Sequence, residues 1–132
     1  LDAGTPEIRL SNRTRVRAEK LQADFGTRVR VYDWVQAGNM IDDAALLVNT
    51  TSLGMMGKAE LRVPLDGLRP QTLVTDLVYT PLKTRLLETA EQVGCATVDG
   101  LGMLLHQAVP GFERWFGQRP EVDRATRAAA LR

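Results

Sequence analysis

Apolar positions along this 132-residue chain follow two alternating spacings, which predict strands and helices in turn. Residues 7–11 alternate between polar and apolar side chains and predict a short strand, while Ala18, Leu21 and Phe25 recur at helical spacing. Residues 45–49 form an unbroken apolar run, which is typical of a parallel strand buried on both faces. The remaining predictions are strands near residues 29–33, 73–79 and 96–98, and helices near residues 84–93, 101–116 and 122–131.

This order of strands and helices predicts an α/β fold with an open, mostly parallel sheet and helices on both faces. A chain of this length has room for a single domain, so residues 1–132 are expected to form one unit. Gly4, followed by Pro6, has the pattern that follows a helix end, although no helix precedes it here. We therefore interpret the chain as part of a larger unit.

Composition excludes several classes of function. Seventeen basic against sixteen acidic residues give a net charge of +1, so neither nucleic acid nor another extended polyanion is an expected partner. One cysteine, Cys95, and one histidine, His106, cannot supply the four ligands of a structural zinc site. Cys95 cannot form an internal disulfide either, which favours a reducing, cytoplasmic location. Ser11 and Ser52 lie outside any serine-hydrolase turn, and no apolar run approaches the roughly 18 residues of a membrane helix.

Polar segments follow several of the predicted strands. Residues 12–14 follow the first strand, residues 49–52 follow the third, Tyr79 ends the fourth, and Gly100 begins the last long helix. The carboxyl ends of parallel strands meet at one edge of a sheet, where ligands bind. We therefore expect these segments to converge on one site.

Three arginines lie at the start of the first predicted helix. Thr14 is placed to cap that helix, whose free N–H groups favour an anion, whereas the helix dipole disfavours Arg13, Arg15 and Arg17. Arg13 and Arg17 are four residues apart and suit one phosphate, while Arg15 is expected to be solvated. No carboxylate follows the strand, which favours the 2′-phosphate of NADP over the ribose hydroxyls of NAD. A solvated basic turn is the alternative.

The last long helix has two distinct faces. One stripe of this helix contains Gly100, Met103 and Gln107, and it suits a cofactor ring and a polar substrate. The simpler alternative is that Met103 lies in the core and Gln107 on the surface. His106 is expected to be a partly exposed helix residue, and Pro110 to bend the helix or weaken it locally. The other face is apolar and is expected to pack on the sheet; it comprises Leu101, Leu104, Leu105, Ala108, Phe112, Trp115 and Phe116.

Five motifs in the same order make the chain resemble the C-terminal, NADP-binding half of the shikimate dehydrogenase family. They are N-R-T-x-x-R-A from Asn12, N-T-T-S-L-G-M from Asn49, D-L-V-Y-T-P-L-K-T from Asp76, D-G-L-G-M-L-L-H-Q-A from Asp99 and F-E-x-W-F-G-x-x-P from Phe112. The resemblance implies a Rossmann-like fold. It also implies an oxidoreductase that interconverts 3-dehydroshikimate and shikimate with NADPH in aromatic amino-acid biosynthesis.

The resemblance also implies roles for individual residues. Leu77 and Gly100 would approach the nicotinamide through backbone contacts, with Met103 beside the ring, and Tyr79 and Gln107 would hydrogen-bond the substrate. Quinate in place of shikimate stays open, as does a nucleotide-binding module without catalysis. The adenosine side of NADP, including the ribose and its 2′-phosphate, would be held by Asn12, Arg13, Thr14, Arg17, Thr51 and Ser52.

Three features of the family are missing from these residues: its first strand, its glycine-rich pyrophosphate loop, and its N-terminal substrate domain with the catalytic lysine and aspartate. Lys20, Lys58 and Lys83 do not match the motif of that lysine, so no catalytic residue is assigned and the chain is expected to be inactive alone. A sheet without its first strand exposes ladder groups on the neighbouring strands. We therefore expect the chain to associate with a second copy or with the missing N-terminal part.

Overall fold

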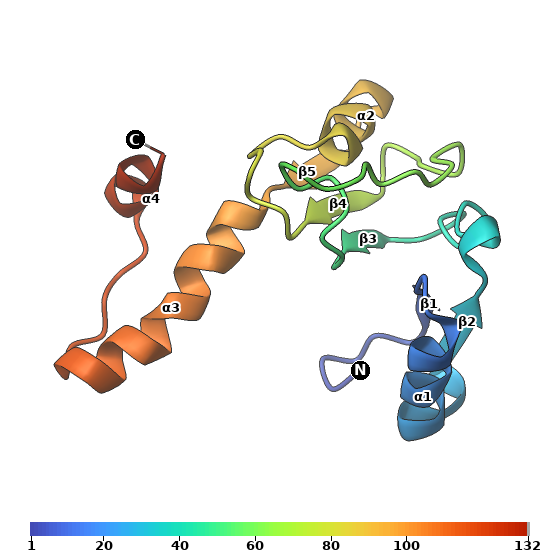
Figure 1. Ribbon diagram of the computed structural model, residues 1–132, viewed down its shortest axis with the longest axis horizontal. Coiled ribbons are helices and arrows are strands. Elements are labelled where there is room, and N and C mark those ends of the chain that lie inside the picture. Colours follow the sequence, from blue (N-terminus) through green and yellow to red (C-terminus); the bar gives the residue numbers. More distant parts are fainter. Residues whose placement is uncertain (132) are drawn as a thin grey trace. The chain divides into compact units, whose positions relative to one another are not determined.

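The computed structural model describes residues 1–131, which divide into two compact units. Unit 1 comprises Leu1–Ala44 and Arg62–Arg69, and unit 2 comprises Ala45–Leu61 and Pro70–Arg132. Each unit contains its own parallel sheet (Figure 1). The parallel pairing of all the paired strands agrees with the sequence-based expectation.

The sheet of unit 1 has two strands. β1 (Ile8–Ser11) and β2 (Val29–Tyr32) run parallel, with Ile8 opposite Val29. Both strands lie within one or two residues of their predicted bounds, because alternation and apolar content are local signals that survive in the folded chain.

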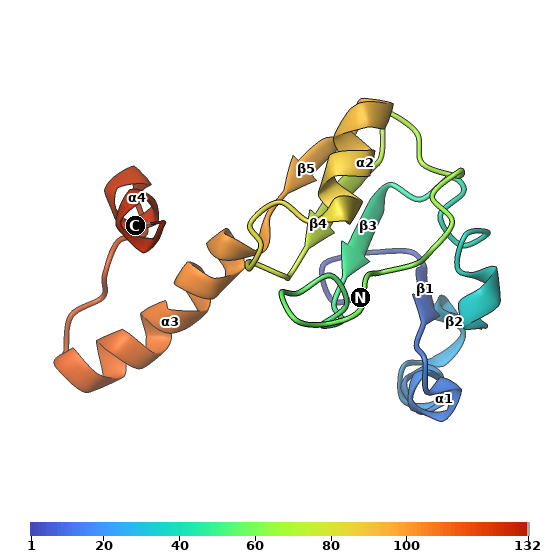
Figure 2. The ribbon, with the colours of Figure 1, turned by 45° about the horizontal axis from the view of Figure 1, so that its top comes forward.

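The connection between these strands is helical. α1 (Arg15–Phe25) packs against β1 and β2 and buries Ala18, and η1 (Gly26–Arg28) leads into β2 (Figure 2). Gly26 has a φ of 78°, which a residue with a Cβ rarely adopts. The glycine therefore lets the chain leave the helix at the predicted position.

The rest of unit 1 consists of short turns. η2 (Trp34–Gln36) follows β2, and the turns after it bury Ala37 and Ile41, together with Leu68 from the second segment of the unit. These buried apolar side chains give unit 1 a small core besides the contact between α1 and its sheet.

The sheet of unit 2 has three parallel strands: β3 (Leu46–Asn49), β4 (Leu73–Asp76) and β5 (Ala96–Val98), with β4 in the middle. The strand predicted to reach Tyr79 ends at Asp76 instead. The reason is local: the Val78 amide donates to Oδ1 of Asp76 at 2.9 Å, which turns the chain out of the ladder.

One helix covers part of this sheet. α2 (Arg85–Val93) contacts β4 and β5 and buries an apolar face made of Leu86, Leu87 and Ala90 (Figure 2). It begins after Thr84 and ends at Gly94, whose φ of 93° is the left-handed conformation expected of a glycine after a helix.

The long helix α3 (Gly100–Phe116) corrects one expectation. Its first residues and Val109 are buried, but most of its predicted apolar face does not pack on the sheet, and Trp115 is 78% exposed. Figure 1 shows α3 leading away from β5 toward α4 (Arg124–Ala130). The helix also continues through Pro110. An amphipathic pattern identifies an apolar face but does not determine what covers it.

Within residues 1–131, no helix combines the length and the apolar character that crossing a bilayer requires.

Candidate functional site

Charge is distributed unevenly along β1. Next to its amino end, Glu7 accepts from Arg9 at 2.7 Å and forms an ion pair with Arg30 at 2.9 Å. The hydrogen bond from Arg9 is the main reason why the pKa of Glu7 lies below its usual value. The carboxyl end of the same strand has no acidic residue between Ser11 and Thr14.

The segment after β1 contains the predicted phosphate-binding arginines. Within residues 1–131, neither Arg13 nor Arg17 uses its guanidinium in a hydrogen bond or ion pair. Arg15 is exposed, as expected, but it also pairs with Glu19 at 2.6 Å and with Asp33, and these bonds raise its pKa. Of the three arginines, Arg15 thus has acidic partners, whereas the guanidinium groups of Arg13 and Arg17 have none among the described residues.

The prediction that Thr14 caps α1 is only partly correct. It occupies the N-cap position of α1, but its side chain makes no cap hydrogen bond. Asn12 orders this turn instead, because its Nδ2 donates to the Thr14 carbonyl at 2.9 Å. The start of α1 is thus held by a backbone carbonyl and an amide side chain, and the hydroxyl of Thr14 is not used in the cap.

A buried polar junction lies at the carboxyl ends of β3 and β4 in unit 2, where Asn49 and Asp76 are register partners. Nδ2 of Asn49 donates to Oδ1 of Asp76 at 3.0 Å, and the hydroxyl of Thr84 donates to Oδ2 at 2.7 Å. All three side chains are buried, and Asp76 is only 1% exposed. We call Asn49, Asp76 and Thr84 the strand-end junction.

The loop after β3 is organised by this junction. Oδ1 of Asn49 accepts from the amide of Thr51 at 3.0 Å and from its hydroxyl at 2.8 Å, and the Thr51 hydroxyl accepts from the Leu53 amide at 3.0 Å. The predicted cofactor residue Thr51 therefore uses its hydroxyl within the turn, whereas Ser52 is exposed beside it. Any cofactor role of Thr51 then falls to its backbone or methyl group.

Leu77 and Gly100 lie against one another. A Cβ added to Gly100 would come within 2.5 Å of the Leu77 carbonyl oxygen and 2.6 Å of the Val78 oxygen, so only glycine fits. This is the close backbone approach expected of Gly100 from its place on the helix stripe. The other stripe residues are accessible: Met103 is 36% exposed and Gln107 is exposed, as is Tyr79 at 41%.

The predicted site residues are thus divided between the units. Unit 1 holds the residues from Asn12 to Arg17, and unit 2 holds the others, with Leu77 and Gly100 in direct proximity. The convergence of every segment on one edge stays a prediction. Sequence reasoning did not assign a role to the strand-end junction, although Asn49, Asp76 and Thr84 all lie in the motifs that carried the resemblance, and polar residues at the ends of apolar strands were the available signal.

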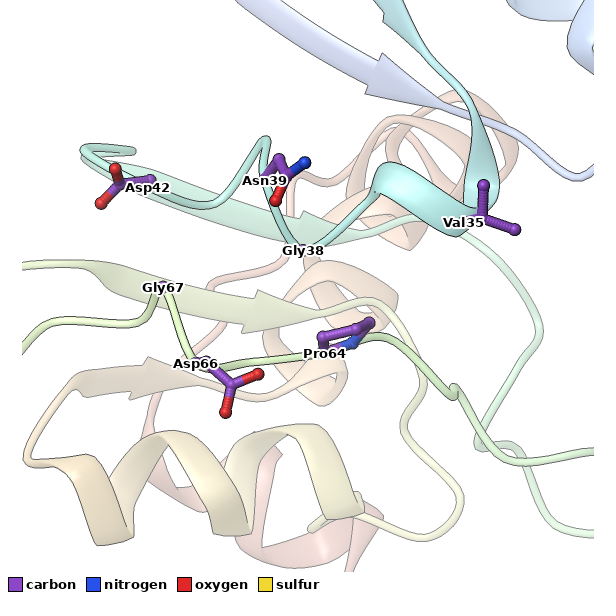
Figure 3. A pocket seen from close by; sticks show the side chains of 7 residues that line it. All are labelled: Val35, Gly38, Asn39, Asp42, Pro64, Asp66 and Gly67. Carbon is purple, nitrogen blue, oxygen red and sulfur yellow. The ribbon is translucent and has the colours of Figure 1, made fainter.

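A hollow of about 380 Å³ lies in unit 1, and its lining includes none of the predicted site residues (Figure 3). Its polar walls include two carboxylates, Asp42 and Asp66, which would repel a phosphate. Asp42 is paired with Arg69 at 2.6 Å. Because of these carboxylates, the hollow is not a candidate site for the cofactor phosphates. Among residues 1–131, no group of histidine, cysteine, aspartate or glutamate side chains is arranged to hold a metal ion. Its lining residues are Val35, Gly38, Asn39, Asp42, Pro64, Asp66 and Gly67.

Comparison with known proteins supports the expected family. A family model described as the shikimate 5′-dehydrogenase C-terminal domain matches residues 100–130, which span α3 and α4. The shikimate dehydrogenase (NADP(+)) of Cereibacter sphaeroides is 70% identical over 131 residues, which are 99% of this chain and 47% of that protein.

Solved structures give the same picture. The quinate dehydrogenase of Corynebacterium glutamicum in complex with NAD is 30% identical with a TM-score of 0.80, over 91% of this chain and 44% of that one. The shikimate 5-dehydrogenase of Thermus thermophilus in complex with NADP(H) and shikimate is 34% identical with a TM-score of 0.74, over 91% and 43%. These neighbours confirm the open, Rossmann-like fold.

The chain spans about half the length of the curated relatives it matches. The identity to the relative from C. sphaeroides is high along that whole span, and the matched family model is that of a C-terminal domain. Over the part that it spans, the chain is similar to the C-terminal part of shikimate dehydrogenases.

Proposed function

We propose that this chain is the NADP-binding part of a shikimate dehydrogenase, an oxidoreductase that reversibly reduces 3-dehydroshikimate to shikimate with NADPH. The observation that carries the proposal is the pair of uncommitted guanidinium groups, Arg13 and Arg17, next to a strand end without a carboxylate. Arginine at this place in a dinucleotide-binding fold accommodates the 2′-phosphate of NADP. The relative from C. sphaeroides carries the same cofactor preference in its name.

At the adenosine end, Arg13 and Arg17 would bind the 2′-phosphate as charge-assisted donors, and Asn12 would hold the turn that presents them. Arg15 is paired with Glu19 and with Asp33, the residue after β2, so it would not compete with its neighbours for the anion. These residues fit a phosphate because the two free cations have no competing acid in the segment.

At the nicotinamide end, Gly100 and Leu77 would present a backbone surface to the ring, and Met103 would pack beside it. Tyr79 and Gln107 would donate hydrogen bonds to hydroxyl or carboxylate oxygens of the substrate. NADPH supplies the hydride when it is bound. The residues of this chain would orient the ring and the substrate.

Quinate is the second candidate substrate. It is favoured by the structural likeness to a quinate dehydrogenase, and the polar groups of Tyr79 and Gln107 suit either ring. Direct comparison of the two substrates in a protein that also contains the substrate domain would separate these alternatives.

The cofactor proposal is tested by calorimetric titration of the 132-residue chain with NADP⁺ and NAD⁺. We expect tighter binding of NADP⁺, and we expect Arg13→Ala to weaken NADP⁺ binding about tenfold while leaving NAD⁺ binding unchanged, because a charge-assisted hydrogen bond is lost. Arg62→Ala is the matched control, since Arg62 is an exposed arginine of unit 1 outside the segment. Equal binding of the two nucleotides, unaffected by Arg13→Ala, would contradict the proposal.

We also propose that the chain does not oxidise shikimate by itself, because Lys20, Lys58 and Lys83 do not match the lysine motif of the family. Appearance of reduced nicotinamide absorbance in a mixture of the chain, NADP⁺ and shikimate would contradict this. Association with a second copy or with a further segment stays a prediction.

A further inference from the structure

The strand-end junction lies beneath two loops that bear predicted ligand residues. We propose that Asp76 is a positioning residue for the nicotinamide and substrate end of the site, acting through the loops after β3 and β4 without touching the ligand. The proposal rests on the proposed function, because the ligand residues of those loops come from it.

Asp76 reaches three separate parts of unit 2. Its Oδ1 accepts from Nδ2 of Asn49 at 3.0 Å and from the Val78 amide at 2.9 Å, and its Oδ2 accepts from the hydroxyl of Thr84 at 2.7 Å. These donors belong to the end of β3, to the turn after β4 and to the residue that caps α2. One carboxylate therefore ties both loops and the helix to the end of the central strand.

The consequences for the loops are direct. On the β4 side, Val78 lies between Leu77 and Tyr79, so the bond from its amide fixes the backbone that carries both predicted ligand residues. On the β3 side, Asn49 transmits the constraint. Its Nδ2 donates to Asp76, and Oδ1 of the same side-chain amide accepts from the amide and hydroxyl of Thr51. Asn49 also donates to the Leu53 carbonyl at 3.1 Å, which closes the turn around Ser52.

The two loops also touch each other through the backbone. The Met56 amide donates to the carbonyl of Thr80 at 2.8 Å, and the Gly100 backbone leaves no space for a side chain beside Leu77. A shift of the turn after β4 would therefore move the loop after β3 and the start of α3 with it.

Stability alone does not account for the choice of a carboxylate at this position. Asp76 is 1% exposed, and the three partners named above are neutral, so its burial is not offset by an opposite charge among them. A carboxylate has two oxygens that accept several hydrogen bonds in one plane, which an apolar side chain cannot do. The group is suited to fixing directions, and the directions it fixes are those of the two loops.

The test uses the 132-residue chain with Asp76→Ala and, as conservative variant, Asp76→Asn. Asparagine keeps an oxygen for Asn49 and Val78, and the hydroxyl of Thr84 can turn to accept from its amide. Two ligands separate the ends of the site: adenosine 2′,5′-bisphosphate reports on Arg13 and Arg17, and the nicotinamide fluorescence of NADPH reports on the other end. Amide hydrogen exchange at Thr51 and Val78 reports on the loops without any ligand.

For Asp76→Ala we expect exchange at Thr51 and Val78 to accelerate at least about tenfold, and NADPH to bind about tenfold more weakly with a smaller fluorescence change. Affinity for adenosine 2′,5′-bisphosphate should stay within about twofold. Asp76→Asn should restore the exchange rates at Thr51 and Val78, the NADPH affinity and the fluorescence change. Thr84→Val, with Thr84→Ser as its control, repeats the comparison without a change of charge and serves if Asp76→Ala does not fold.

Unchanged exchange in Asp76→Ala or in Thr84→Val would overturn the proposal, as would an equal loss of affinity for both ligands. The proposed function fails in a different way, because the unmodified chain would then bind neither nucleotide. In that event the exchange rates at Thr51 and Val78 still decide whether Asp76 holds the loops.

Discussion

Asn12 and Asn49 occupy similar positions in the two units, at the carboxyl ends of parallel strands, but they differ in burial and in the hydrogen bonds they make. Asn12 makes one hydrogen bond, to the Thr14 carbonyl at 2.9 Å, at the surface of unit 1. Asn49 is buried in unit 2 and bonds to the side chain of Asp76, to Thr51 and to the Leu53 carbonyl.

This difference separates two ways of preparing a ligand site. Around Asn12 the prominent feature is free charge, because Arg13 and Arg17 have no protein partner within the described residues. Around Asn49 the prominent feature is a fixed backbone held by buried hydrogen bonds. A phosphate carries charge and tolerates flexible cations, whereas a ring and a substrate that must meet in one geometry need a rigid surface.

The largest expected effect is that of Gly100→Ala in unit 2. The new Cβ would overlap the backbone of Leu77 and Val78, and backbone cannot rotate away, so we expect a loss of about 3 kcal/mol in the free energy of unfolding. Gly102→Ala is the matched control, because outside its chain neighbours and the backbone of its own helix no atom lies within 4 Å of its Cβ position, and alanine favours a helix by up to about 1 kcal/mol. Urea denaturation followed by circular dichroism measures both. Equal stability of the two variants would show that the contact at Gly100 is not rigid.

A smaller effect is expected from the two asparagines themselves. Asn49→Ala removes the acceptor of the Thr51 amide and one of the two donors to Oδ1 of Asp76, so we expect a loss of about 2 kcal/mol. Asn12→Ala removes one exposed bond and should cost under about 0.5 kcal/mol. The same denaturation assay applies, and similar losses in both variants would remove the contrast between the two strand ends.

The smallest effect is a dependence on pH at the amino end of β1. The hydrogen bond from Arg9 and the charge of Arg30 lower the pKa of Glu7 in the folded chain. A carboxyl with a lowered pKa stabilises the fold above its unfolded pKa, and this contribution is lost as the pH falls through the folded value. We therefore expect Glu7→Gln to flatten the acid limb of the stability curve. Asp24→Asn, which removes an exposed carboxylate of α1 that has no ion pair in the described structure, should leave that limb unchanged.

Much of the fold could be predicted because its signals are local. The bounds of β1, β3, α2 and α3 follow from apolar spacing and from glycines such as Gly94. Two predictions were wrong for local reasons. β4 ends early because the side chain of Asp76 accepts from the Val78 amide, and the side chain of Thr14 makes no cap hydrogen bond to α1. The pairing of Arg15 with Asp33 was not predictable from local signals, because the two residues are 18 positions apart.

The sequence by itself determined the order of the elements, the resemblance to a family, and the absence of an acid beside Arg13, since each depends on neighbouring residues or on a motif. Tertiary structure alone decided that Asn49 and Asp76 meet below the surface, that Gly100 touches the backbone of Leu77, and that the aromatic side of α3 stays exposed. The physical reason is that burial and hydrogen-bond partners depend on strand register and helix direction, which join residues far apart in the chain.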